Sequence, residues 1–185
     1  MPEFIYTVER AEVETAVGDY LAHCVDVPRF LDCCRQCPNY GTRWSCPPFD
    51  FDPMTLWQRF QTLRLYARFL KPCGENRDGD ALIAALRREK PIFLTELLQL
   101  ERGIPGSLAL ACGSCDACAD CTRSGGEACR HPDRQRHSIE SLGGDVSETA
   151  VRYFGRPLLW VQDGAAPDYL MLVGGLLLPG APLCR

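Results

Sequence analysis

The residues of this sequence best suited to chemistry are its cysteines, which number 12 among 185 residues. Five of them, the C-terminal cysteine group, lie between Cys112 and Cys129 as three overlapping C-x2-C steps followed by a Cys-Arg-His-Pro segment. Bacterial ferredoxin loops use C-x2-C-x2-C spacing, and their thiolates bind the iron of a [4Fe–4S] cluster together with a cysteine from elsewhere. We therefore expect Cys115, Cys118, Cys121 and Cys129 to bind one such cluster.

The C-terminal group leaves two alternatives open. Cys112 follows an apolar stretch, so we interpret it as a buried structural thiol, although five cysteines compete for four positions. Zinc also takes four thiolates, but its structural sites usually separate two C-x2-C pairs widely, so an iron–sulfur cluster is favoured and zinc is the alternative. Nearby guanidinium groups would either stabilise an anionic cluster or lie in solvent. These arginines are Arg123, Arg130, Arg134 and Arg136.

An N-terminal cysteine group, CCRQCPNYGTRWSCPP, starts at Cys33. Prolines follow Cys37 and Cys46, and proline restricts the backbone and removes a hydrogen-bond donor, which shapes a rigid loop. Cys34, Cys37 and Cys46 are the evident ligands of a second metal centre. Without a fourth ligand, an open iron could bind an exogenous molecule, as an enzyme would need. The candidates for a fourth ligand are Cys33, Cys24 and Cys73.

The expected cellular compartment decides how these cysteines are interpreted. The first ten residues, MPEFIYTVER, lack the basic and apolar regions of a secretory signal, so we expect a cytoplasmic protein. Thiols stay reduced in the cytoplasm, which favours metal binding over a disulfide scaffold. A net charge of -4 argues against nucleic-acid binding, and no apolar run approaches the ~20 residues of a membrane-spanning helix.

Helices are predicted where capping residues precede suitable segments. We expect a helix over residues 13–24 and another over residues 52–61, whose opening Asp-Pro pair is typical of a helix start. Asp80 is expected to cap a further helix, and Pro91 should break or kink it before a second helical stretch that ends near residue 101.

A last helix and several strands complete the expected elements. Asp145-Val-Ser-Glu resembles a capping box, and Gly155 should end the helix that it opens. Alternating or continuous apolar runs predict strands, one of which leads directly into the C-terminal cysteine group. The expected strands cover residues 4–8, 63–70, 107–111, 158–161 and 169–178.

We expect residues 1–185 to form a single cysteine-rich metal-binding domain of the α+β class. Its small mixed sheet would carry helices packed on one face, and the two cysteine-rich loops would face each other near one end. A layered α/β arrangement is the alternative, because strands and helices partly alternate along the chain.

The motifs resemble those of a cysteine-rich family described as predicted metal-binding proteins of unknown function. The resemblance starts with Cys34-x2-Cys37-Pro-Asn-Tyr-Gly and Trp44-x-Cys46-Pro-Pro. It continues with Leu-Glu-Arg ahead of the C-x2-C-x2-C run. The remaining matched segments are Cys129-Arg-His-Pro, Ser138-x-Glu140, Gly143 or Gly144, and Asp145-Val.

This resemblance implies metal or iron–sulfur binding but supplies no reaction. The cysteines that it implicates are Cys34, Cys37, Cys46, Cys115, Cys118, Cys121 and Cys129. The sequence departs from the family pattern in its extra Cys33, Cys112 and Cys184, which affects the choice of ligands rather than the presence of a site.

The leading functional hypothesis is a cytoplasmic iron–sulfur protein that binds one or two [4Fe–4S] clusters and serves electron transfer or cluster-dependent redox chemistry. The alternatives are a zinc-binding structural or interaction module, and an enzyme that uses an open cluster iron. We expect an unknown redox partner protein but no nucleic acid or membrane, and the chain could form a homo-oligomer. The sequence contains no P-loop and no dinucleotide-binding fingerprint.

Overall fold

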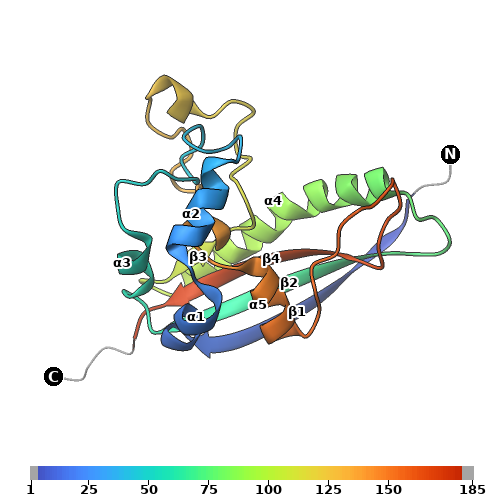
Figure 1. The fold of residues 1–185 in the computed structure, drawn as a ribbon, viewed down its shortest axis with the longest axis horizontal. Coiled ribbons are helices and arrows are strands. Elements are labelled where there is room, and N and C mark those ends of the chain that lie inside the picture. Colours follow the sequence, from blue (N-terminus) through green and yellow to red (C-terminus); the bar gives the residue numbers. More distant parts are fainter. Residues whose placement is uncertain (1–3, 181–185) are drawn as a thin grey trace.

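A four-stranded sheet forms the centre of the computed structural model, which describes residues 4–180. The strand order is β1-β2-β4-β3, and every pair of neighbouring strands is antiparallel (Figure 1). The α+β class is confirmed, although the sheet is antiparallel throughout rather than mixed. The strands are β1 (Tyr6–Ala16), β2 (Thr62–Pro72), β3 (Leu108–Leu110) and β4 (Leu170–Leu178).

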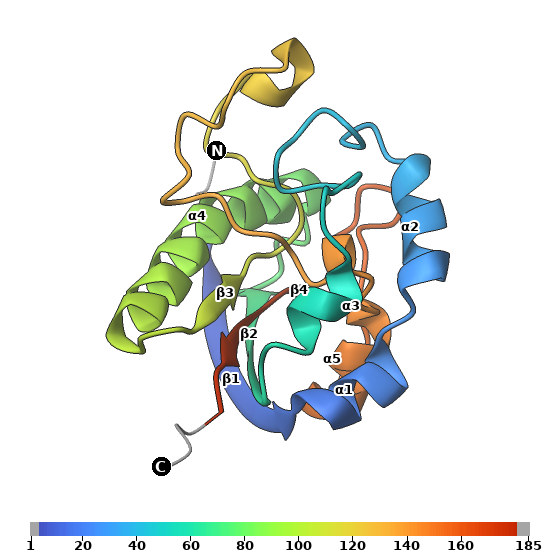
Figure 2. The same ribbon diagram turned by 90° about the vertical axis from the view of Figure 1, so that its left-hand side faces the viewer.

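Helices cover both faces of this sheet, so the expectation that they pack on one face is wrong. Leu63 and Leu65 of β2 join one apolar cluster, whereas Leu70 of the same strand joins another on the opposite face. Successive side chains of a strand point to opposite faces, and a central strand buried on both sides needs cover on both. Figure 2 shows α4 (Gly79–Gly103) on one side of the sheet. On the other side lie α1 (Val17–Cys24), α3 (Pro53–Trp57) and α5 (Val146–Phe154).

Helix α4 is continuous where the sequence predicted a break or kink. Pro91 lies inside it, and the buried residues Phe93 and Leu97 carry its apolar face on past the proline. Packing of this face against the sheet therefore outweighs the hydrogen bond that proline cannot donate. The N-cap is Asp78 rather than Asp80, because the Asp78 carboxylate accepts the Ala81 N–H at 3.0 Å.

The other predicted helices differ mainly in their boundaries. The helix expected over residues 13–24 begins only at Val17, because β1 pairs with β2 through Ala16. The helix expected over residues 52–61 ends at Trp57, and its predicted Asp52 cap is confirmed by bonds from the Met54 and Thr55 amides. The predicted Asp145 cap and Gly155 end of α5 are confirmed as well.

Four of the five predicted strands correspond to β1, β2, β3 and β4, but residues 158–161 form no strand. The sequence analysis also missed α2 (Val27–Arg35), which carries two cysteines of the N-terminal group. Its start has the usual signals: Asp26 caps the helix by accepting the Arg29 N–H at 3.1 Å, and Pro28 follows in the first turn. No helix in the described part of the chain is both long enough and apolar enough to span a membrane.

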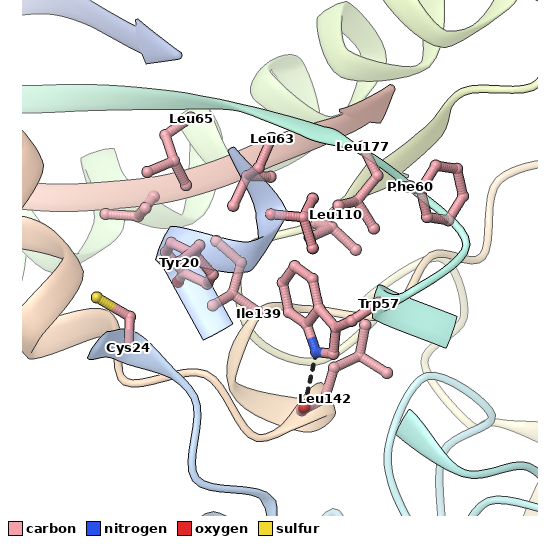
Figure 3. Close-up of a cluster of buried hydrophobic side chains, with 12 residues drawn as sticks. Tyr20, Cys24, Trp57, Phe60, Leu63, Leu65, Leu110, Ile139, Leu142 and Leu177 are labelled. Atoms are coloured by element: carbon pink, nitrogen blue, oxygen red, sulfur yellow. Dashed lines mark hydrogen bonds between the residues drawn. The ribbon is translucent and has the colours of Figure 1, made fainter. Parts of the chain in front are cut away.

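An aromatic core fixes the segments that flank the cysteine loops (Figure 3). The Trp57 indole donates a hydrogen bond to the Leu142 carbonyl at 3.0 Å, and the Tyr20 hydroxyl lies 2.7 Å from the Thr149 hydroxyl. Leu142 ends the short 3-10 helix η2 (Glu140–Leu142), which follows the C-terminal cysteine group along the chain. The core therefore holds the segment after this cysteine group against α1 and α3.

Candidate functional site

The four predicted ligands of the C-terminal group line one small pocket. The three C-x2-C cysteines lie on the open chain after β3, and the 3-10 helix η1 (Thr122–Gly125) then reverses its direction. Hydrogen bonds from the Glu127 N–H to the Thr122 carbonyl, and from the Thr122 hydroxyl to the Ala128 carbonyl, close this turn. Cys129 thereby joins the pocket lined by Cys115, Cys118 and Cys121.

Backbone amides point at sulfur atoms of this pocket. The His131 N–H donates to the Cys129 sulfur at 3.4 Å. Burial raises the pKa of the Cys115 thiol, while a hydrogen bond from the Ala117 amide acts to lower it. Amide donors of this kind favour the thiolate, which is the form that binds metal, and they tune the potential of a bound cluster.

Residues 43–45 of the N-terminal cysteine loop complete the same pocket and form its roof. The Arg43 guanidinium donates to the Cys115 carbonyl at 2.9 Å, and the Cys115 N–H donates to the Ser45 hydroxyl at 2.9 Å. The Trp44 indole donates to the Glu127 carbonyl at 3.0 Å. These roof residues were not predicted as part of the site, because about 70 residues separate them from their partners and no local spacing reveals such contacts.

The N-terminal group starts on a helix rather than in a loop. Cys33 and Cys34 lie in the last turn of α2, and the Cys37 N–H donates to the Cys34 carbonyl at 3.0 Å. Burial, and to a smaller extent the neighbouring Cys46 and Cys37 thiols, raise the pKa of Cys34 to about 11. Burial also raises the pKa of Cys46, and the Ser45 hydroxyl 3.7 Å from its sulfur acts against this shift. The three predicted thiols of this group therefore lie near enough to one another for their charges to interact.

The candidates for a fourth ligand of the N-terminal group lie in three different places. Cys24 is only 1% exposed and belongs to the aromatic core, as Figure 3 shows. Cys73 follows the end of β2, where its N–H donates to the Ile5 carbonyl at 2.9 Å, and Figure 1 shows this end of the sheet well apart from the cysteine loops. Cys33 precedes Cys34 on α2 and is exposed. Of the three candidates, Cys33 alone lies within the group.

The remaining cysteines have separate environments. Cys112 is buried in the cluster beneath α4, where burial raises the pKa of its thiol, and it does not line the pocket of the four predicted ligands. This placement agrees with its interpretation as a structural thiol. All cysteines in residues 4–180 are free thiols, and Cys184 lies outside the described residues.

The arginines around the C-terminal group make specific contacts. Arg123 donates to the Arg43 carbonyl at 2.8 Å and to the carbonyls of Cys46 and Pro48, so it joins the two loops. Arg136 pairs with Glu101 of α4, with contacts of 2.9 and 3.0 Å. Arg130 lines the pocket of the four cysteines, whereas Arg134 lines a separate hollow beside α4. The expected opposition of the two cysteine loops at one end of the molecule is therefore confirmed by direct contacts.

Comparison with known proteins identifies the family. A family model described as "Predicted metal-binding protein (DUF2284)" matches residues 22–178. The chain belongs to this family. Both cysteine groups lie inside the matched range, and the resemblance inferred from the sequence is confirmed at this level. Neither a curated protein nor a solved structure matches the chain.

The donor set of this DUF2284 chain fits a metal bound by thiolates, because four cysteines with two amide donors share one pocket. Within residues 4–180, no three Cys, His, Asp or Glu side chains are grouped as a single metal ion would need. A tetrahedral zinc with Zn–S distances of ~2.3 Å requires sulfurs roughly 3.8 Å apart, so zinc binding would have to draw the thiols together. The pocket has a volume of only about 10 Å³, so an iron–sulfur cluster, whose thiolates bind several irons, would have to move them apart.

Proposed function

We propose that this DUF2284 protein is an iron–sulfur protein whose [4Fe–4S] cluster is bound by Cys115, Cys118, Cys121 and Cys129. The observation that carries the proposal is the shared pocket of these four cysteines, with N–H groups directed at the sulfurs of Cys115 and Cys129. When bound, such a cluster supplies reversible one-electron chemistry. A site with four protein ligands offers no open position, which suits electron transfer.

The roof residues support this proposal because they limit the access of water to the pocket. Arg43 and Ser45 hold the backbone of Cys115 from above, and the Trp44 ring lies beneath the Arg123 guanidinium, 5.3 Å from ring centroid to the carbon of that group. Hydrogen bonding, solvent exposure and local charge are the features by which a protein sets a cluster's potential. The guanidinium groups here favour the more negative, reduced state.

The N-terminal group is the natural place for a second metal centre. The Ser45 hydroxyl accepts the Cys115 N–H and lies beside the Cys46 sulfur, so one side chain touches both groups. Two redox centres this close would exchange electrons, and the exposed thiols at Cys33 and Cys37 would face a redox partner protein. The free thiols of the described chain are compatible with a reducing compartment such as the cytoplasm.

Anaerobic purification followed by metal and sulfide analysis tests this proposal. We expect brown protein with broad absorbance near about 400 nm and about four irons per cluster. Electron paramagnetic resonance after dithionite reduction should show a signal of a reduced cluster. Cys73→Ser is the matched control, since Cys73 is half-buried and distant from both groups. Colourless protein with stoichiometric zinc would instead support the structural zinc module.

A second candidate function is an enzyme that uses an open cluster iron of the N-terminal group. It is favoured by the placement of Cys24 and Cys73 away from that group. If Cys33 is not a ligand, the three remaining thiols leave a coordination position for a small molecule, as a cluster enzyme needs. Cys33→Ser separates the possibilities: an unchanged spectrum of the N-terminal centre supports three protein ligands, and loss of that centre supports four.

A further inference from the structure

A cavity lies against the edge of β4 where β3 stops short. β3 pairs with β4 only at Gly175, Leu176 and Leu177, so no described strand pairs with residues 170–173 on that side. A cavity of about 630 Å³ opens beside this edge, and small-molecule sites typically measure ~300–1,000 Å³. The end of β3 therefore creates a notch of ligand size in the sheet.

Apolar side chains form most of the walls of this cavity. Helix α4 contributes Ile83 and Leu86, α5 contributes Val146, and residues 158–161 also line the cavity. Trp160 lies in this last segment and is 69% exposed, which makes it the most exposed of the large apolar side chains in the described chain. An aromatic ring at the rim of an apolar cavity is typical of sites that bind organic molecules.

Glu140 is the ionisable side chain of the wall that has an unpaired atom. Its Oε2 atom is buried and has no hydrogen-bond partner among the described residues. Burial raises the pKa of its carboxyl group, although the Ser138 hydroxyl and the Gly113 amide act to lower it. A buried carboxyl oxygen without a donor is rare in folded proteins, and a ligand is one explanation for it.

The other charged groups of the wall already have partners. The Lys90 ammonium donates to the Ser114 carbonyl at 2.6 Å and pairs with Asp116. The Asp145 carboxylate caps α5 by accepting the Glu148 N–H at 2.9 Å. Glu140 is therefore the ionisable side chain of the wall with an unpaired oxygen, and the complement of its carboxylate is a cation or a strong hydrogen-bond donor.

Two glycines fix the turn that carries Glu140. Gly143 has a φ of +88°, and a Cβ atom there would lie 2.7 Å from the Val27 Cα at the start of α2. A Cβ atom at Gly144 would lie 2.3 Å from a methyl carbon of Ile139. The backbone of the turn is therefore held in place, whereas the Glu140 side chain has rotatable bonds of its own.

We propose that this cavity binds a small organic amine, with its apolar body in the notch beside β4 and its protonated nitrogen on the Glu140 carboxylate. On binding, rotation of the Glu140 side chain would turn its carboxylate into the cavity, and the Trp160 ring, which also lines the cavity, attracts cations. Segments matched by the sequence resemblance but unused by either cysteine group, Glu140 and Asp145-Val146, lie in the cavity wall. The site does not depend on which metal the cysteines bind.

Three probes with one apolar body test the proposal on anaerobically purified, metal-loaded protein: adamantylmethylamine, adamantylmethanol and adamantanecarboxylate. Isothermal titration calorimetry gives the affinities, and a change in tryptophan fluorescence that is lost in Trp160→Ala reports the location. We expect the amine to bind at least about tenfold more tightly than the other two probes. Glu140→Gln should reduce this preference to about twofold or less, while the affinity for the alcohol stays unchanged.

Matched variants keep the test decisive. Glu148→Gln removes an exposed carboxylate of α5 that pairs with Arg152, and it should leave the amine preference intact. Trp160→Ala alters an exposed rim residue without disturbing the core and should weaken binding of the amine most, even if Glu140→Gln fails to fold. The proposal is wrong if no probe binds, if the carboxylate or the alcohol binds as tightly as the amine, or if both Glu140→Gln and Trp160→Ala leave the preference unchanged.

Discussion

The two cysteine groups differ in how the chain builds them. The C-terminal group lies within one loop, and its four predicted ligands line a pocket that residues 43–45 cover. The N-terminal group begins at the carbonyl end of α2, and two of its cysteines, Cys33 and Cys37, are exposed. The cysteines of the C-terminal pocket are all half-buried, whereas the N-terminal group combines half-buried thiols at Cys34 and Cys46 with exposed thiols at Cys33 and Cys37.

If both groups bind metal as proposed, a centre with a full set of protein ligands suits electron storage, whereas a centre with exposed thiols can exchange a ligand or contact a partner. The carbonyl end of a helix disfavours thiolates and favours a bound cation, so a metal bound at the N-terminal group would offset this cost at Cys34. The proposed amine cavity adjoins the N-terminal group, because Phe30 of α2 lines it and the Glu140 charge adds to the raised pKa of Cys34.

The largest expected effect comes from removing one ligand in each group. Cys118→Ser should abolish the cluster of the C-terminal group, with a loss of about four irons per chain, because its pocket contains no spare thiol. Cys37→Ser should affect only the N-terminal centre and leave the iron of the C-terminal centre in place. Iron and sulfide analysis with electron paramagnetic resonance measures both results. Loss of both centres in either single variant would contradict the separation of the groups.

A smaller effect is expected when the Arg123 hydrogen bonds between the two cysteine loops are removed. Arg123 donates to three backbone carbonyls of the N-terminal loop, and hydrogen bonds from a charged donor contribute about 1.5–3 kcal/mol each in favourable cases. Arg123→Met should lower the free energy of unfolding by about 3 kcal/mol, since parts of these contacts are exposed. Denaturant unfolding of anaerobic protein measures this change, with the exposed Arg59→Met as control. Identical unfolding curves for the two variants would show that the loops do not depend on this contact.

The sequence predicted the elements whose signals are local. Alternation over residues 63–70 identified β2, and the Asp52 and Asp145 caps identified the starts of α3 and α5. These predictions failed where contacts with residues distant in sequence determine the bounds of an element. β1 continues through Ala16 because β2 pairs with it there, and α4 passes through Pro91 because the sheet buries the helix on both sides of the proline.

The same limit applies to the site. Spacing alone identified the four cysteines that share the C-terminal pocket, because they belong to one short loop. The roof residues Arg43 and Ser45 and the cavity residue Glu140 depend on contacts between segments far apart in sequence. Cys24, Cys33 and Cys73 were indistinguishable as fourth ligands until the fold separated them.

Ser45 offers a finer comparison, because its hydroxyl contacts both groups. Ser45→Ala leaves the Cys115 N–H without its acceptor, which should cost about 1 kcal/mol of the free energy of unfolding. It also removes the neighbour of the Cys46 sulfur. We expect the spectra of both centres to shift in this variant, whereas Thr42→Ala, an exposed hydroxyl of the same loop, should shift neither. A change confined to one centre would show that Ser45 does not connect them.

The smallest expected effect is a loss of stability at low pH, and its size should differ between the two cysteine loops. The His137 ring lies 3.2 Å from the Ser45 carbonyl and packs against Phe49 and Phe51, with ring centroids 4.6 and 5.3 Å away. Burial lowers the pKa of His137 below its usual 6.5, so the unfolded chain takes up a proton more readily than the folded protein. Stability is therefore complete above about pH 6.5 and falls as the pH drops through the lowered pKa of the folded state.

His137→Asn should remove this part of the acid sensitivity while keeping an N–H for the Ser45 carbonyl. Hydrogen exchange at about pH 7.5 and about pH 5 measures it segment by segment. In the parent protein, acid should increase exchange in residues 45–51 more than in residues 115–121, because His137 packs on the N-terminal loop. Equal increases in both segments, or the same increase in His137→Asn, would mean that acid acts on the two cysteine groups through another residue.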